Sequence, residues 1–263
     1  MSLGSKVTGE EPRPIILTYH EIVTVECAYR YVLTTARLAE HLTALNHVQP
    51  ASQWSDPGLI TFDDGHASHH RYALPLLERL GRKATFFVTV ADVDRRPEAV
   101  TWEQLREMHA LGHAIESHGW SHRFLTRCSD AELREELERS KKSLEDGMGA
   151  PVRAIAMPGG RCDGRVLQSA AMAGYARVYD SNAWRGERHC HGIELIGRFM
   201  AHRDLDAAEL IRVIGLRGWP RLGRRLAGCR CVSALRSWDW SRRRACGRWS
   251  PRPSRCARRL GSS

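Results

Sequence analysis

Short apolar runs alternate with amphipathic stretches along the chain from Ile15 to about Leu216. This alternation is the pattern expected when parallel strands are joined by crossover helices. We predict six strands, at Ile15 to Tyr19, Leu59 to Phe62, Ala84 to Val90, His113 to Ser117, Ala154 to Met157 and Ala176 to Tyr179. So many β–α units within roughly 200 residues indicate a barrel or a doubly wound sheet, and active sites in both gather where strands end.

Helix signals fall between these strands. We predict helices over His69 to Leu80, after Thr101, after Ser129, and from about Asp206 to Gly215. Thr101 and Gln104 have the spacing of a capping box, in which each side chain binds the other residue's backbone N–H. Ser129 and Glu132 repeat that signature ahead of the clearest helical segment of the chain.

The periodic pattern stops after Leu216, so we predict one domain over residues 1–216 and a tail over residues 217–263. The formal net charge is +10, but the tail alone, with 14 arginines and the single acid Asp239, carries +13 and leaves −3 for the domain. Its composition favours disorder, and it is also compatible with translation in a shifted reading frame or with an arginine-rich arm that binds nucleic acid. Because the basic charge belongs to the tail, we expect no nucleic-acid partner for the domain.

The cysteines of the domain are scattered singly, without the spacing of a structural zinc site or the density of a disulfide scaffold. They are Cys27, Cys128, Cys162 and Cys190. We therefore expect reduced thiols. The N-terminal residues contain no apolar run long enough for a signal peptide, and no later segment has the length of a membrane span. A cytoplasmic location is the default expectation.

The first segment with candidate chemistry is an apolar strand that runs into Asp63, Asp64 and Gly65. Successive side chains at a strand end point in different directions, so one aspartate can ligate a cation while its neighbour faces a bound water. An Asp-Asp-Gly turn without any function is an equally good interpretation of this segment taken alone.

A second predicted strand ends at His118, and His122 follows four residues later. Two histidines at this spacing converge on one ion if the residues between them make one helical turn. His66 and His70 have the same spacing but lead into a helix, where they are expected to form its solvated first turn. A carboxylate with two imidazoles leaves coordination positions open, as a catalytic metal site requires.

Four segments together resemble the NodB-type polysaccharide deacetylase family, also known as carbohydrate esterase family 4. They are TFDDG at 61–65, SHGWSH at 117–122, LTYHE at 17–21 and KATFFV at 83–88. The resemblance covers most of residues 14–212 and implies a distorted (β/α) barrel.

In that family the first aspartate of the pair is the catalytic base, and the second ligates the metal with the two histidines. The resemblance therefore implies Asp63 as the base and Asp64, His118 and His122 as the metal ligands. It also implies zinc or another divalent transition metal, and a carbohydrate substrate that contains N-acetylglucosamine, with O-acetylated sugars as a lesser option.

The later motifs of the family match less closely. Residues 156–161, Ala-Met-Pro-Gly-Gly-Arg, resemble the third motif, and the resemblance places Pro158, Gly159 and Arg161 along the substrate groove. Ala156 stands where the family often has an arginine that orients the catalytic aspartate. We therefore expect Asp63 to be oriented from elsewhere, with Arg161 as the candidate.

Residues 180–184 have the Asp and Trp spacing of the fourth motif and suggest Trp184 as a substrate contact, although a surface loop with a packed Trp explains them almost as well. His202 stands where the fifth motif supplies a histidine general acid, and its alternative is an exposed loop histidine. Gly119 replaces the Ser or Thr usual after the first ligand histidine, which is expected to loosen that loop.

The mechanism that fits these residues is metal-assisted hydrolysis of an acetamide. Two other interpretations stay open. One is hydrolysis of a small cyclic amide on the same scaffold. The other is a non-catalytic glycan-binding relative or an inactive gene product, suggested by the altered third motif and the abnormal tail.

Overall fold

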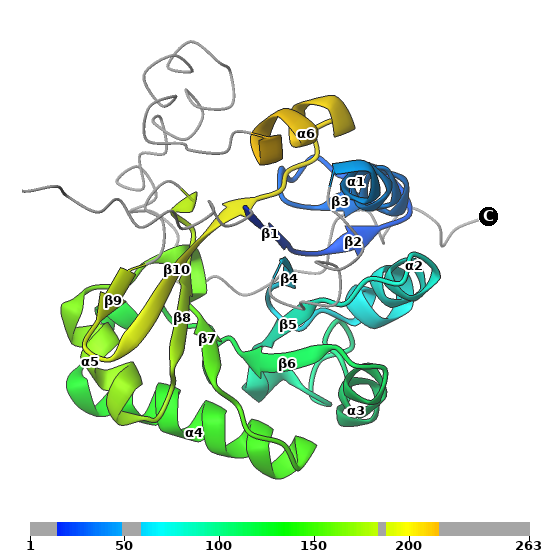
Figure 1. Cartoon of the computed structure of the whole chain (residues 1–263). Coiled ribbons are helices and arrows are strands. Elements are labelled where there is room, and N and C mark those ends of the chain that lie inside the picture. The colour runs from blue at the N-terminus through cyan, green and yellow to red at the C-terminus, as the bar shows by residue number, and fades with distance from the viewer. Residues whose placement is uncertain (1–14, 49–58, 184–187, 216–263) are drawn as a thin grey trace, which may run out of the picture.

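The computed structural model describes residues 15–48, 59–183 and 188–215. Seven parallel strands form its central sheet: β1 (Ile16–Tyr19), β4 (Ile60–Phe62), β5 (Thr85–Val88), β6 (Ala114–Ser117), β7 (Ala154–Ala156), β8 (Arg177–Asp180) and β10 (Ile193–Met200). They follow one another in this order, and β10 pairs with both β8 and β1, so the sheet closes into a barrel (Figure 1). The expected (β/α) barrel is confirmed.

The six predicted strands are all present, with ends that differ by a few residues. β10, which closes the barrel, was missed as a strand because Gly197 and the buried Arg198 interrupt its apolar run. The other unpredicted strands are short: β2 (Ile22–Val23) and β3 (Leu33–Thr34) form a separate two-stranded sheet, and β9 (Arg188–Cys190) forms an antiparallel hairpin with β10.

Helices connect the strands. The α-helices are α1 (Thr35–Val48), α2 (Leu74–Arg79), α3 (Trp102–Ala110), α4 (Asp130–Met148), α5 (Gly164–Met172) and α6 (Ala207–Gly215). Shorter turns are η2 (His69–Ala73), η3 (Val90–Asp92), η4 (Leu125–Arg127) and η5 (Pro158–Gly160). η2 is a π-helical turn that runs into α2, so the segment predicted as one helix from His69 changes its hydrogen-bond pattern part-way along. α1 and α5 were not predicted.

Both predicted capping boxes are confirmed. Thr101 Oγ1 accepts from the Gln104 backbone N–H at 3.2 Å, and Gln104 Oε1 accepts from the Thr101 N–H at 3.0 Å. Ser129 and Glu132 exchange the same pair of bonds at the start of α4. These caps fix where α3 and α4 begin, and therefore where the loops after β5 and β6 must end.

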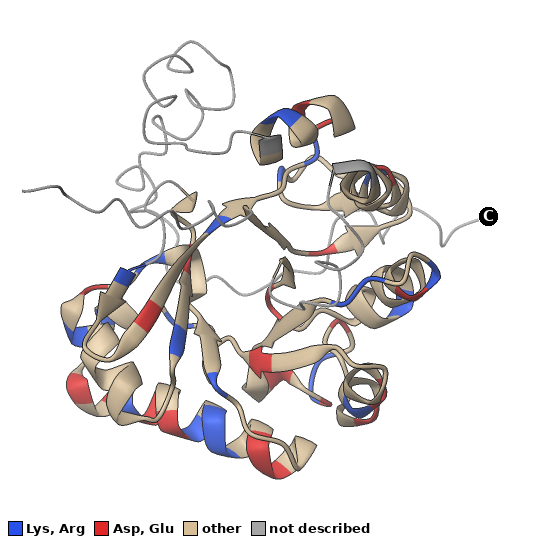
Figure 2. Cartoon of the chain, viewed as in Figure 1, with Lys and Arg blue, Asp and Glu red and all other residues tan. Residues whose placement is uncertain are grey.

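α4 lies against the barrel with an apolar face and turns a charged face to solvent. Leu133, Leu137 and Leu144 are fully buried. Figure 2 shows acidic and basic side chains mixed along the outer face of this helix, where ion pairs join residues four apart. No helix within the three described ranges is long and apolar enough to cross a membrane. The predictions about the tail concern residues 217–263, which lie outside the described residues.

Replacing Leu137 by Ala should lower the free energy of unfolding by about 2 to 5 kcal/mol, because it leaves a cavity where α4 packs on the barrel. Glu138 is the next residue and lies on the exposed face of the helix, so Glu138→Ala should change the free energy of unfolding by less than about 0.5 kcal/mol. Urea denaturation monitored by circular dichroism measures both. Equal stability of the two variants would show that α4 does not pack as described.

Candidate active site

The predicted metal ligands lie at the carboxyl ends of β4 and β6, two strands that are joined through β5. Asp64 follows β4 with a φ of 79°, and His122 has a φ of 61°. Residues other than glycine adopt this left-handed conformation at a cost, and such strain collects at functional sites. Here it turns the two side chains toward the centre, where His118 arrives from the end of β6.

The three side chains converge on a common point. Asp64 Oδ1 lies 3.3 Å from His118 Nε2 and 3.2 Å from His122 Nε2. One ligand atom from each residue lies within 4.8 Å of the other two. A carboxylate oxygen and two imidazole nitrogens form a donor set suited to Zn²⁺ and to similar divalent transition metals. The geometry therefore brings together the three residues that the sequence singled out.

Two further observations fit a bound cation. The Nδ1–H of His118 donates to the Ala156 carbonyl at 2.9 Å, which leaves the Nε2 lone pair directed at the common point. Asp64 Oδ1 is buried and has no hydrogen-bond partner among the described residues. Burial raises the pKa of Asp64, but His118 and His122 outweigh burial and hold the pKa well below its ordinary value. The carboxyl group is thus ionised and available as a ligand.

Asp63 is held by a buried arginine on the closing strand. Arg198 Nη1 and Nη2 donate to Asp63 Oδ1 and Oδ2 at 2.7 and 2.8 Å, and both side chains are almost fully buried. Arg198 Nη1 also donates to Thr61 Oγ1 at 3.0 Å. Burial raises the pKa of Asp63, but Arg198, followed by His118, outweighs burial, so the pKa lies below its ordinary value. A bidentate pair of this kind fixes the orientation of the carboxylate.

The expectation that Arg161 orients Asp63 was wrong. Arg198 binds both oxygens of Asp63, whereas Arg161 is exposed on the loop after η5. The sequence contained a signal for Arg198, since an arginine inside an otherwise apolar strand must find a buried partner. That signal was overlooked because the strand itself was not predicted.

His20 is a site residue that the sequence reasoning missed. It follows β1, the strand between β4 and β10, and its Nδ1 is buried without a hydrogen-bond partner among the described residues. Burial lowers the pKa of His20, while the charges of Asp64 and then Asp63 raise it. Its position directly after a strand is the same signal that singled out His118.

His202 lies two residues beyond β10 and is mostly buried. Burial, followed by the charge of Arg30, lowers its pKa to about 4, with smaller effects from Asp204 and His41. The charged groups that shift the pKa of His202 thus differ from those that shift the pKa of His20.

The loop after β7 packs closely on its neighbours. A Cβ on Gly159 would lie 2.1 Å from Phe124 Cε1, and a Cβ on Gly160 would lie 2.1 Å from Ser181 Oγ, so only glycine allows this approach. Pro158 is buried. These contacts hold the third-motif loop between the loops that follow β6 and β8. Trp184, predicted as a substrate contact, lies outside the described residues.

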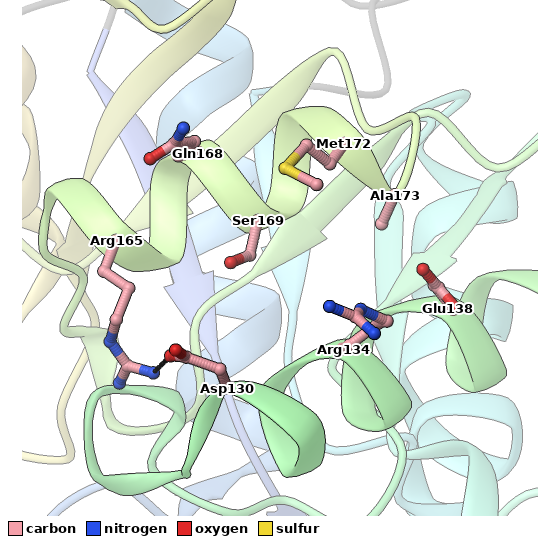
Figure 3. Close-up of a pocket in the computed structure, with 8 residues that line it drawn as sticks. All are labelled: Asp130, Arg134, Glu138, Arg165, Gln168, Ser169, Met172 and Ala173. Carbon is pink, nitrogen blue, oxygen red and sulfur yellow. Dashed lines mark hydrogen bonds and ion pairs between the residues drawn. The ribbon is translucent and has the colours of Figure 1, made fainter.

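A hollow of about 240 Å³ lies elsewhere, between α4 and α5 on the outside of the barrel (Figure 3). Asp130 and Arg165 form an ion pair of 2.9 Å across it, and Met172 is 76% exposed beside it. None of the residues that line it belongs to the group around Asp63 and Asp64. It is therefore separate from the candidate active site.

The family model described as polysaccharide deacetylase matches residues 55–178. Chitin deacetylase 1 of Cryptococcus neoformans var. grubii is 30% identical over 138 residues, which cover 48% of this chain and 28% of that protein. The chitooligosaccharide deacetylase of Bradyrhizobium sp. is 31% identical over 122 residues, which cover 46% of this chain and 53% of that protein. The chain thus spans from about a quarter to about half of the length of these relatives.

Among solved structures, the Streptococcus pyogenes deacetylase PplD in complex with acetate superposes with a TM-score of 0.67 at 22% identity, over 77% of this chain and 99% of that one. IcaB from Ammonifex degensii gives a TM-score of 0.64 at 24% identity, over 76% and 97% of the two chains. These likenesses show the shared barrel. The family model places residues 55–178 of this chain in the polysaccharide deacetylase family.

Proposed function

We propose that this protein is a metal-dependent hydrolase that removes acetyl groups from carbohydrates containing N-acetylglucosamine. The observation that carries the proposal is the convergence of Asp64, His118 and His122 beside an aspartate held by Arg198. Membership of the family supports the same activity, since its relatives include chitin and chitooligosaccharide deacetylases.

Asp64, His118 and His122 would hold the metal. A divalent ion held there would polarise the acyl oxygen and lower the pKa of a water molecule. Asp63 lies next to this position and is ionised at neutral pH because Arg198 lowers its pKa. Arg198 donates one N–H to each oxygen of Asp63, and a carboxylate can accept about four hydrogen bonds. Asp63 therefore keeps the capacity to accept the proton of the attacking water.

Hydrolysis also requires a proton at the departing nitrogen. As the new bond from the water oxygen to the acyl carbon forms, the bond from carbon to nitrogen breaks, and acetate and a free amine result. His20 follows β1, the strand paired with β4, and the charges of both carboxylates raise its pKa. A neutral imidazole can accept a proton on one nitrogen and donate from the other. We propose that His20, rather than His202, delivers this proton.

The substrate would lie over the carboxyl ends of the strands. The loop that carries Pro158, Gly159 and Arg161 is the proposed contact surface, since it packs beside the loop of the ligand histidines and exposes Arg161. Trp184 stays a further candidate from the sequence.

The zinc-loaded protein should release acetate from acetylated chitooligosaccharides, and Asp63→Asn should lower the rate by about a hundredfold or more because the proton acceptor is lost. Asp146→Asn, the same change on the exposed face of α4, is the matched control and should leave the rate unchanged. Enzymatic acetate detection measures all three proteins.

Equal rates for Asp63→Asn and the wild type would contradict the role of Asp63. Binding of the oligosaccharide by the wild type without acetate release would favour a glycan-binding relative. Cleavage of a small cyclic amide instead would favour the other hydrolase activity.

Replacing Arg198 by Met should lower kcat by about 10- to 100-fold with zinc still bound, because Asp63 loses its orienting partner. It should also lower the free energy of unfolding by about 3 to 5 kcal/mol, since an uncompensated carboxylate stays buried. The double variant Asp63→Asn, Arg198→Met should recover part of that stability. Urea denaturation of the two single variants and the double variant tests the coupling. Additive losses would show that the pair is not formed.

His20→Gln and His202→Gln separate the two candidates for the proton donor. We expect His20→Gln to lower kcat by about 10²- to 10⁴-fold while zinc stays bound, and His202→Gln to keep kcat near that of the wild type. Steady-state kinetics on the zinc-loaded proteins, with their metal content measured, provides the comparison. A large loss in His202→Gln alone would return the role to His202.

A further inference from the structure

We propose that Glu136 is a positioning residue for the metal site, because it holds the loop between the two ligand histidines in the conformation in which both imidazoles meet Asp64. This inference rests on the proposed metal-dependent function and concerns a residue on α4 that belongs to none of the motifs discussed above. Figure 1 shows α4 on the outside of the barrel beside β6 and β7.

Glu136 binds the middle of the loop with both carboxylate oxygens. Its Oε2 accepts from the backbone N–H groups of Trp120 and Ser121 at 3.0 and 2.9 Å. Its Oε1 accepts from the Ser121 hydroxyl in a short hydrogen bond. Three donors thus converge on a side chain that is only 5% exposed. Since a buried carboxylate is costly unless hydrogen bonds compensate it, the loop and Glu136 stabilise each other.

The carbonyl groups of the same loop are bound by a second element, η3. Val90 N–H donates to the Gly119 carbonyl at 3.3 Å, and Ala91 N–H donates to the Trp120 carbonyl at 2.9 Å. Glu136 and η3 together therefore fix the peptide groups between the ligands. The loop is set in place by the protein's own residues, and the metal does not have to order it.

The arrangement also explains how the loop stays ordered with Gly119 directly after His118. Gly119 has a φ of 79°, and its N–H donates to Ser117 Oγ at 3.1 Å. A Cβ there would face Glu136 Oε2 at 3.5 Å. The sequence led us to expect a loosened loop because Gly119 has no side chain. Hydrogen bonds from the loop to the side chains of Ser117 and Glu136 hold it instead.

The consequence for metal binding is measurable. Glu136→Ala leaves two backbone N–H groups and one hydroxyl without their acceptor and frees the loop, so zinc affinity should fall by about 10- to 100-fold. Glu136→Gln keeps an acceptor oxygen for the two N–H groups, and its affinity should stay close to that of the wild type. Zinc competition against a chromophoric chelator measures each dissociation constant.

Glu145→Ala is the matched control. Glu145 lies on the same helix and also accepts from a backbone N–H, that of Val152 at 3.1 Å, but that residue precedes β7 at the opposite end of the barrel from the site. This variant should lose stability and keep the zinc affinity of the wild type. The absorption spectrum of the Co²⁺ form should change in Glu136→Ala and stay unchanged in Glu145→Ala, because it reports ligand geometry rather than stability.

If Glu136→Ala does not fold, Glu136→Asp provides the test, since it keeps the charge but withdraws the oxygens from the loop. Unchanged zinc affinity and an unchanged Co²⁺ spectrum in the folded variants, with tight binding by the wild type, would overturn the role of Glu136 and leave the proposed function intact. Failure of the wild type to bind zinc or cobalt would overturn the metal-dependent function, and the inference with it.

Discussion

The buried ion pair between Arg198 and Asp63 couples closure of the barrel to the geometry of the candidate site. Both side chains are buried inside the barrel, and neither charge is tolerable there without the other. Arg198 is in register with Ile16 on β1, and Asp63 follows β4 on the other side of β1. The pair therefore reaches across β1 and joins the strand that closes the barrel to the strand that precedes Asp63, the proposed base. Closure of the barrel and orientation of Asp63 thus depend on the same contact.

The other parts of the site use the same means. His118 is anchored by a carbonyl of β7, and the loop that follows it is bound by α4 and by η3. Each contact comes from a neighbouring barrel unit rather than from the loop itself. The positions of Asp63 and of the three candidate ligands are thus set by elements with buried faces, which is how a site on loops acquires the precision that the proposed chemistry requires.

The sequence was sufficient to predict the site residues that stand at strand ends. Asp64, His118 and His122 each stand at or near a strand end, and parallel strands bring their carboxyl ends to one edge, so the convergence could be predicted. The partners of Arg198 and Glu136 could not be predicted, because they lie 135 and about 15 residues away and the contacts depend on which strand closes the barrel and which helix face turns inward. His20 had the same strand-end signal as His118. Only the structure shows that the charges of Asp63 and Asp64 act on His20, whereas those of Arg30 and Asp204 act on His202.

The relation between Ala156 and Arg198 shows how one residue of a motif can differ while Asp63 still has an arginine partner. In a closed barrel, side chains from several strands point to one interior, so a guanidinium can reach a given carboxylate from more than one strand. Here it comes from β10 and lies over the rings of Phe87 and Tyr179, at 5.1 and 5.7 Å. Ala156 packs in the same apolar cluster as those two rings, where a small side chain is compatible with the arginine that arrives from the other strand. The arginine that binds Asp63 is therefore defined by its position inside the barrel, and it can come from another strand than the one that carries the motif.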